Sequence, residues 1–201
     1  MAVINVSLNE LYKSIGKILS KEELEEYLLN IKCELDEIEG NYAKIEIKDF
    51  NRPDLYSING IVRELKGILN IEKGIPEIKV NESDYKLIID KNVDRFMIGA
   101  IVKNVKLNED RLKDLIQLQE KITQSYGRNR QKVAIGTHNF DLIEFPVYFK
   151  LSDPNRKFIP LGEEKELTLK EILEKTEAGR KYGNILKGKY YILVDSKDEI
   201  I

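Results

Sequence analysis

The sequence contains 201 residues, of which 42% are hydrophobic and 34% are charged, and its formal net charge is −2. This length and composition predict a folded chain with one large domain or two small ones, and they exclude a disordered polypeptide. The near balance of charge argues against a surface that is basic throughout and binds nucleic acid non-specifically, although a local basic patch is compatible with it. Cys33 is the only cysteine, which excludes an internal disulfide and a cysteine-based zinc site.

The sequence also predicts where the protein resides. Its N-terminus, MAVINVSLNEL, lacks the charged and apolar regions of a signal peptide. No apolar run approaches the roughly 18 residues that a helix needs to cross a bilayer. We therefore expect a cytoplasmic protein that has no membrane partner, and a single free cysteine fits that reducing compartment.

The first 70 residues predict a small α+β unit. Two serines are each followed three residues later by glutamate and then by apolar residues at helical spacing, which is the pattern of a capping box. In chain order, we expect a strand at 3–6, helices after the pairs Ser7–Glu10 and Ser20–Glu23, and strands at 33–38 and 43–47 joined by a turn at Gly40 and Asn41. The first of these helices should bury Leu8, Leu11, Ile15 and Ile18.

A further helix is predicted within DFNRPDLYSINGIVRELKGIL, residues 49–69. This stretch opens with a proline-containing turn, and either Ser57 or Asp54 is placed to cap the helix that follows. Its apolar residues recur at helical spacing and form one face: Ile58, Ile61, Val62, Leu65, Ile68 and Leu69. Arg63 lies on the other side. Spacing alone predicts an amphipathic helix packed on a sheet.

The second half of the chain begins after residues 71–85, a stretch with Gly74, Pro76 and a polar cluster that marks the candidate boundary. Beyond it we expect strands at 87–90, 97–105, 133–136, 145–150 and 190–194, a long helix at 109–126 and a short helix capped by Thr168 and Glu171. The long helix should turn Leu112, Leu115, Ile116, Gln119 and Ile122 inward and end at Gly127.

These elements predict the fold class α+β, with two small mixed α/β domains in which helices pack on sheets. The first is an N-terminal domain at 1–85, which includes the linker at 71–85, and the second covers 86–201.

His138 is the only histidine and so the only candidate histidine base for a nucleophilic serine or cysteine. It lies in Ile135-Gly-Thr-His-Asn-Phe-Asp141, at the predicted end of a strand, where clefts in α/β folds often open. A lone histidine is more often structural than catalytic, so both interpretations stay open. No metal site is predicted, because there is no second histidine and no carboxylate pair at ligand spacing.

Arg128, Arg130 and Lys132 form a basic loop after the long helix. Such a loop either binds phosphates or is simply solvated. The sequence has no glycine-rich phosphate loop of either common spacing, so no nucleotide cofactor is predicted on this chain.

The motif Arg-Pro-Asp-Leu-x-Ser-x-x-Gly-Ile-x-Arg-Glu-Leu, from Arg52 to Leu65, resembles the N-terminal domain of the phenylalanyl-tRNA synthetase β subunit. The resemblance extends over nearly the whole chain, through NVSLNELYKSIGKILSKEELEEYL, RFMIGAIVKNVKL, LIQLQEKITQSYGRNRQKVAIGTHNFDLI and FIPLG. The bacterial form inserts an oligonucleotide-binding barrel where this chain has the plain turn at Gly40 and Asn41. The resemblance is therefore to the archaeal and eukaryotic-cytosolic type.

In that family the β subunit joins a catalytic α subunit in an (αβ)2 heterotetramer, which ligates phenylalanine to tRNA(Phe) with ATP and Mg2+. Its second domain hydrolyses mischarged Tyr-tRNA(Phe), and the subunit runs several hundred residues beyond the stretch matched here. The resemblance implies that residues 86–201 are the first part of this tRNA-editing domain. It also implies that this chain alone does not activate phenylalanine and binds no cofactor.

By the same resemblance, Thr137, His138 and Asn139 correspond to strand-end residues on one wall of the editing pocket. A neighbouring loop corresponds to Phe158, Pro160, Leu161 and Gly162. Arg128, Arg130 and Lys132 become candidates for tRNA contact. No catalytic side chain is assigned, because water positioned by the pocket and the tRNA would attack the ester. Two alternatives stay open: a non-catalytic assembly module for the α subunit, and a freestanding aminoacyl-tRNA deacylase.

Overall fold

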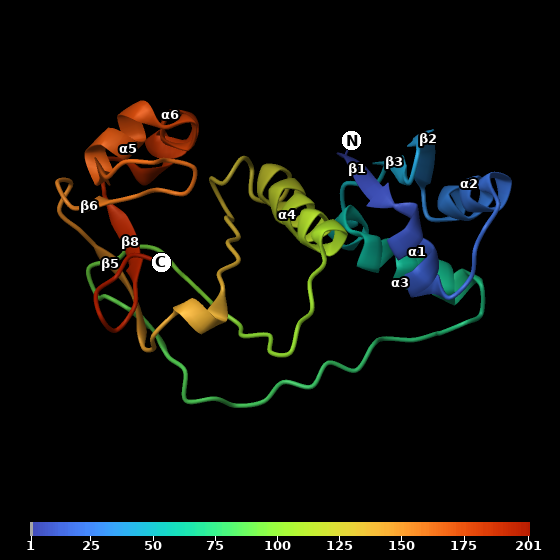
Figure 1. Cartoon of the computed structure of the whole chain (residues 1–201), viewed down its shortest axis with the longest axis horizontal. Coiled ribbons are helices and arrows are strands. Elements are labelled where there is room, and N and C mark those ends of the chain that lie inside the picture. The colour runs from blue at the N-terminus through green and yellow to red at the C-terminus, as the bar shows by residue number, and fades with distance from the viewer. Residues whose placement is uncertain (1) are drawn as a thin grey trace. The chain divides into compact units, whose positions relative to one another are not determined.

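The computed structural model describes residues 2–201, which form two compact units that each combine two stretches of the chain (Figure 1). Unit 1 comprises Met1–Lys79 and Val105–Gly136, and unit 2 comprises Val80–Asn104 and Thr137–Ile201. Helices and small sheets occur in both, which confirms the predicted α+β class. The predicted domains followed chain order, whereas residues 105–136 group with the first unit.

The sheet of unit 1 has the order β1-β3-β2 and is antiparallel throughout. Its strands are β1 (Ala2–Ser7), β2 (Cys33–Glu39) and β3 (Tyr42–Ile47), as the sequence predicts. On the central strand, Ala43, Ile45 and Ile47 are buried, while the alternate residues are not. One face of the sheet is therefore apolar and lies under the helices.

Three helices cover that face: α1 (Leu8–Ile15), α2 (Lys21–Asn30) and α3 (Ile58–Ile68). Ser20 and Glu23 form the predicted capping box of α2. Ser7 caps α1, but the Glu10 side chain does not close a box, because it bonds to Asn108 and Arg111 instead. The prediction that Ile18 is buried is wrong: α1 ends at Ile15, and Ile18 is 79% exposed.

Helix α3 follows a short 3-10 turn, η1 (Pro53–Tyr56), and buries the predicted apolar face. Ser57 is the residue that caps it, and Asp54 instead pairs with Arg52 and Arg63. Gly60 lies where α3 comes closest to η1, because a Cβ built on it would stand 1.7 Å from the backbone oxygen of Asp54. Only glycine allows this approach.

Helix α4 (Glu109–Gln124) belongs to unit 1 and contacts β1 and η1. The prediction of its inward face is wrong for Leu112 and Ile116, while Leu115 and Gln119 are half-buried. Leu112 and Ile116 are 45% and 52% exposed, while Ile122, together with Leu118, packs against the core. The helix instead turns polar residues inward, and Asp114 is buried. These polar residues face inward because backbone N–H groups of β1 and α3 that lack a backbone partner donate to them: Asn5 to Gln117 and Ile58 to Asp114.

Unit 2 contains a three-stranded sheet, a two-stranded sheet and two short helices. The larger sheet has the order β4-β5-β8, with β4 parallel and β8 antiparallel to the central strand. The elements are β4 (Leu87–Ile89), η2 (Phe140–Leu142), β5 (Val147–Leu151), β6 (Lys157–Phe158), β7 (Leu167–Thr168), α5 (Leu169–Lys175), α6 (Glu177–Tyr182), η3 (Gly183–Leu186) and β8 (Tyr191–Val194). Thr168 and Glu171 form the predicted capping box of α5.

The predicted strands at 97–105 and 133–136 are wrong, because neither stretch is assigned to a strand. Most of their apolar side chains are exposed: Ile98 is 96% exposed and Val133 is 43% exposed. The alternating pattern is typical of a strand, but a strand needs a hydrogen-bonded neighbour. Within residues 2–201, no named strand or isolated bridge pairs with either stretch.

The close approach at Gly60 predicts a difference between two glycines of α3. Gly60→Ala should lower the free energy of unfolding by about 1–3 kcal/mol, because η1 must move away from the new methyl group. A Cβ at Gly67 would come no nearer than 4.0 Å to another atom, so Gly67→Ala should gain up to about 1 kcal/mol from helix propensity. Urea denaturation measures both. Equal midpoints for the two variants would contradict the packing of α3 on η1.

Candidate functional site

The basic loop that follows α4 is folded tightly onto the end of that helix. The amide groups of Asn129 and Arg130 donate to the carbonyl oxygens of Gln124 and Thr123, at 3.1 and 3.0 Å. Three consecutive residues, 128–130, have φ values of 47°, 54° and 67°. This left-handed conformation costs non-glycine residues energy, so the turn is held by its hydrogen bonds.

The side chains of this loop have different surroundings. Arg130 is half-buried and forms an ion pair with Glu120 on α4. Arg128 and Lys132 are exposed. The structure therefore gives Arg130 a role in fixing the loop, and it leaves Arg128 and Lys132 as the accessible cations. That these residues contact RNA stays a prediction.

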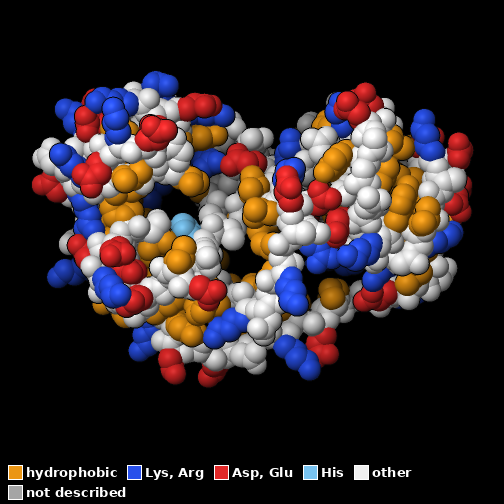
Figure 2. All heavy atoms as spheres, viewed as in Figure 1, with side chains coloured by type: hydrophobic (Ala, Val, Ile, Leu, Met, Phe, Trp, Pro, Cys, Tyr) orange, Lys and Arg blue, Asp and Glu red, His pale blue; other side chains and the backbone are white. Residues whose placement is uncertain are grey.

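The polar turn Thr137-His138-Asn139 opens the second stretch of unit 2, and all three residues are exposed. The Asn139 side chain accepts a hydrogen bond from the Asp141 amide at 3.1 Å and caps η2. His138 lies at the surface (Figure 2, pale blue). The strand that we expected before this turn is not formed, so in the described chain the three side chains do not follow a strand end.

The loop that contains Leu161 and Gly162, which the resemblance places on the wall of the editing pocket, is a tight turn. The Glu163 amide donates to the Pro160 oxygen at 3.0 Å, and Gly162 has a φ of 88°. Leu161, at the tip of this turn, is fully exposed. Leu161 and Gly162 thus stand in solvent, and their place in a pocket stays a prediction, as it does for residues 137–139.

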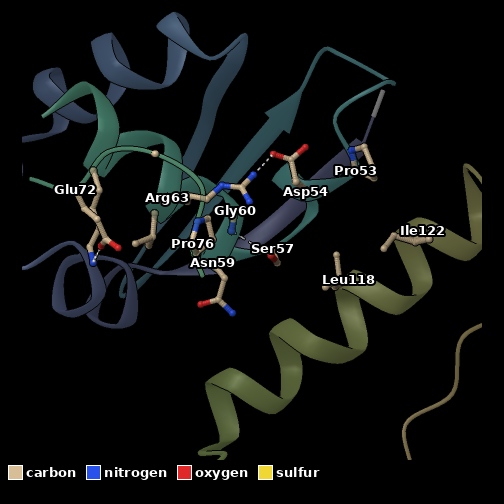
Figure 3. Close-up of a pocket in the computed structure, with 13 residues that line it drawn as sticks. Pro53, Asp54, Ser57, Asn59, Gly60, Arg63, Glu72, Pro76, Leu118 and Ile122 are labelled. Carbon is tan, nitrogen blue, oxygen red and sulfur yellow. Dashed lines mark hydrogen bonds and ion pairs between the residues drawn. The ribbon is translucent and has the colours of Figure 1, made fainter. Parts of the chain in front are cut away.

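A hollow of about 530 Å³ opens on unit 1, and no pattern in the sequence predicts it. Figure 3 shows Leu118 and Ile122 facing it from α4, opposite the start of α3. Its lining comes from η1, α3, the stretch after α3 and α4: Pro53, Asp54, Ser57, Asn59, Gly60, Val62, Arg63, Lys66, Glu72, Gly74, Pro76, Leu118 and Ile122. The motif that opens α3 therefore supplies most of one wall.

The charged groups at this hollow are paired with one another. Arg63 binds Asp54 at 3.0 Å (dashed in Figure 3), and Lys66 binds Glu72 at 3.0 Å. A hydrogen bond from Arg52 lowers the pKa of Asp54 below its usual range, although partial burial opposes this. The hollow therefore offers apolar surface bordered by ion pairs, and its lining holds no histidine or cysteine.

The described residues offer neither a reactive thiol nor a metal site. Cys33 is fully buried, and burial raises the pKa of its thiol to about 12, so it is not a nucleophile. Within residues 2–201, no group of three or more histidine, cysteine, aspartate or glutamate side chains is arranged to hold a metal ion. In the same residues, no helix is both long and apolar enough to span a bilayer.

Charge is mixed over the surface. On the face shown in Figure 2, Lys and Arg side chains alternate with Asp and Glu on each unit, in keeping with the net charge of −2. Contact with a polyanion would therefore depend on local groups such as the basic loop.

Comparison with known proteins finds similarity to one family. A model of the "Phe-tRNA synthetase beta subunit B1 domain" matches residues 1–70. The phenylalanine--tRNA ligase β subunit of Pyrococcus horikoshii is 44% identical over 210 aligned residues, and that of Methanosphaera stadtmanae is 41% identical. Each alignment covers all of this chain but only 38% and 37% of the respective relative.

A solved structure has the same fold. The crystal structure of an N-terminal fragment of the phenylalanyl-tRNA synthetase β subunit from Pyrococcus horikoshii matches with a TM-score of 0.93 and 42% identity. The match covers 99% of this chain and 60% of that fragment. The resemblance drawn from the sequence motifs is thereby confirmed: residues 1–70 match the B1 domain of the phenylalanyl-tRNA synthetase β subunit family, and the whole chain is similar in sequence and fold to the N-terminal part of archaeal members.

Proposed function

We propose that this chain is the N-terminal region of the β subunit of a phenylalanine--tRNA ligase, which contributes to binding tRNA(Phe), to assembly with a catalytic α subunit and to hydrolysis of Tyr-tRNA(Phe). The observation that carries the proposal is the structural match over 99% of the chain at 42% identity. Similarity of this extent supports a shared role as well as a shared fold. The chain spans about 38% of the length of the relatives it matches, so the activity belongs to the complete enzyme.

The proposed enzyme is an (αβ)2 heterotetramer in the cytoplasm. The synthetic reaction would use ATP and Mg2+ on the α subunit, since this chain has no phosphate-binding glycine loop. Its own contribution would be to hold tRNA and to edit. Phenylalanine and tyrosine differ by one hydroxyl, and an apolar pocket excludes an added hydroxyl only about a hundredfold. A second site that hydrogen-bonds this hydroxyl supplies the missing discrimination.

The proposed hydrolysis needs no protein nucleophile. Water attacks the ester carbonyl between tyrosine and the terminal ribose, and the ribose hydroxyl leaves. Thr137, His138 and Asn139 supply hydroxyl, imidazole and amide groups, which orient water and substrate by hydrogen bonds. Their exposure supports this role, because a bound tRNA end can reach them.

Two alternatives predict different results. A non-catalytic assembly module would bind the α subunit but leave hydrolysis unchanged when residues 137–139 are altered. A freestanding deacylase would hydrolyse Tyr-tRNA(Phe) as the 201-residue chain alone, without an α subunit. Assays of the isolated chain and of the complete enzyme therefore separate all three.

In the complete enzyme, Thr137→Ala and His138→Ala should each slow Tyr-tRNA(Phe) hydrolysis about 5- to 30-fold and leave Phe-tRNA(Phe) synthesis within about twofold, because one lost hydrogen bond costs about 1–2 kcal/mol. Deacylation of preformed Tyr-tRNA(Phe) and aminoacylation measure the two rates. Thermal melting serves as the control. A His138→Ala variant that edits normally but melts early would show that the histidine is structural.

The basic loop gives a second test. Arg128→Ala combined with Lys132→Ala should weaken tRNA(Phe) binding and lower the slope of log affinity against log salt by about two, since each lost phosphate contact lowers it by about one. The double variant Lys73→Ala with Lys79→Ala removes two exposed cations elsewhere in unit 1 and is the matched control. Equal slopes for the two double variants would show that the loop is only solvated.

A further inference from the structure

Three aromatic side chains in unit 2 form a cluster that neither the sequence analysis nor the proposed function uses. Tyr85 precedes β4, Phe140 begins η2 and Phe145 precedes β5. The ring centroids of Tyr85 lie 5.2 Å from Phe140 and 4.7 Å from Phe145, and those of Phe140 and Phe145 are 5.7 Å apart. We call these three residues the aromatic cluster.

A lysine from a fourth segment lies against the cluster. The Lys103 ammonium is 4.8 Å from the ring centroid of Tyr85 and 5.3 Å from that of Phe140, and it donates to the Tyr85 hydroxyl at 3.4 Å. These distances are within the range of cation–π attraction. The cluster therefore combines aromatic faces with a positive charge.

The cluster is open to solvent on one side. Tyr85 is 40% exposed and Lys103 is exposed, whereas Phe140 and Phe145 are half-buried. A cluster that served only as a small core would bury all three rings, whereas Tyr85 is the most exposed of them and lies beside the exposed Lys103. Exposed aromatic surface beside a cation is the arrangement that binds single-stranded nucleic acid, since bases stack on rings and phosphates bind cations.

Polar groups that could recognise a nucleotide precede the cluster in the chain. His138 and Asn139 are exposed and lead directly into Phe140. The Asn139 oxygen caps η2, and this bond leaves the amide nitrogen available as a donor. Imidazole and amide groups hydrogen-bond to base edges and to ribose hydroxyls.

The acidic neighbours limit the length of nucleic acid that fits. Asp84 and Asp141 are exposed and adjoin Tyr85 and Phe140 in the sequence, while Glu144 forms an ion pair with Lys197. Lys86 is also exposed and follows Tyr85, so these two carboxylates are balanced by two lysines, Lys86 and Lys103, and this near-neutral setting does not favour a long phosphate backbone. A single terminal nucleotide, with one base and one phosphate, matches this charge.

We infer that the aromatic cluster and Lys103 bind the terminal nucleotide of a single-stranded RNA 3′ end, with the base stacked on Tyr85 and its phosphate on Lys103. This inference rests on the proposed function and deepens it, because the terminal nucleotide of a mischarged tRNA carries the amino acid. Stacking there would bring the ester next to His138 and Asn139. Tyr85 and Lys103 would thus position the substrate without taking part in bond breaking.

The test uses a short single-stranded RNA that ends in C-C followed by 2-aminopurine, whose fluorescence is quenched when it stacks. Titration with the 201-residue chain should quench this probe. Tyr85→Leu keeps an apolar side chain but removes the ring, and it should abolish the quenching and weaken binding about tenfold or more. Tyr85→Phe keeps the ring and should quench as the unchanged chain does.

Lys103→Met tests the cation. It keeps the length of the side chain and should weaken binding about threefold or more, and it should lower the salt slope by about one. Tyr148→Leu and Lys165→Met alter an exposed tyrosine on β5 and an exposed lysine between β6 and β7, and both should bind as the unchanged chain. Circular dichroism confirms that each variant is folded.

Several outcomes would overturn the inference. They are an unquenched probe with the unchanged chain, equal quenching when 2-aminopurine stands at the 5′ end, and a Tyr85→Leu variant that binds like Tyr148→Leu. The proposed function fails separately. If Tyr85-dependent quenching occurs but the complete enzyme does not hydrolyse Tyr-tRNA(Phe), the nucleotide site stands and the editing proposal falls. If the complete enzyme hydrolyses Tyr-tRNA(Phe) but the Tyr85→Leu variant quenches the probe as the unchanged chain does, the editing proposal stands and the nucleotide site falls.

Discussion

The attachment of α4 to unit 1 depends on side chains that replace missing backbone partners. The Gln117 amide group bonds to Asn5 twice, accepting from its N–H at 2.7 Å and donating to its carbonyl oxygen at 3.2 Å. Gln117 therefore acts on the edge of β1 as a neighbouring strand would. The Asp114 carboxylate accepts from the Ile58 amide at 2.9 Å, at the N-terminus of α3. Burial raises the pKa of Asp114, while this bond opposes the rise.

A second pair of contacts joins the start of α4 to α1. Glu10 accepts from Asn108 at 2.7 Å and from Arg111 at 3.0 Å, and these donors hold its pKa below the usual range. Glu10 lies in the first turn of α1, where the helix dipole also favours an anion. Between α3 and α4 the chain contributes residues 80–104 to unit 2, and these bonds attach α4 to unit 1. The basic loop is carried with α4, so its position depends on the same contacts.

Local patterns in the sequence predicted local structure. The capping boxes at Ser20 and Thr168 form as expected because all their partners lie within three residues. The inward face of α4 was predicted only in part, because Gln117 and Asp114 bond to residues 112 and 56 positions away. Helical spacing identifies which residues share a face, but not which face meets a partner.

The candidate sites also depend on contacts between residues that are distant in the sequence, which local patterns do not predict. The basic loop was evident from composition, but the pairing of Arg130 with Glu120 was not. The hollow of unit 1 combines Pro53, Pro76 and Leu118, which come from three separate stretches of the chain. The aromatic cluster likewise joins residues that the sequence places far apart, and no motif spacing connects Tyr85 with Phe140. Residue types point to chemistry only after the fold has gathered them.

The two units differ in how they are stabilised, and this difference bears on binding. Unit 1 is built around one continuous apolar core that includes its sheet and three helices. Unit 2 has fewer buried apolar residues: Leu169, Ile192 and Val194 form one cluster with partly buried neighbours around it, and Val147 and Phe149 are buried on β5. Ion pairs supplement this small core, such as Asp94 with Lys189 at 2.7 Å and Arg156 with Asp198 at 3.0 Å.

Exposed ion pairs contribute little stability, so unit 2 should open locally at lower free energy than unit 1. The residues proposed to bind the tRNA end, including Tyr85, Lys103 and His138, all belong to this less stable unit. A ligand that binds only the folded state stabilises it in proportion to the logarithm of its concentration relative to its dissociation constant. RNA bound at the aromatic cluster would therefore order the segments that carry Tyr85, Lys103 and Phe140 together. A small core lets these segments adjust to the ligand, and the ligand in turn supplies contacts that the core lacks.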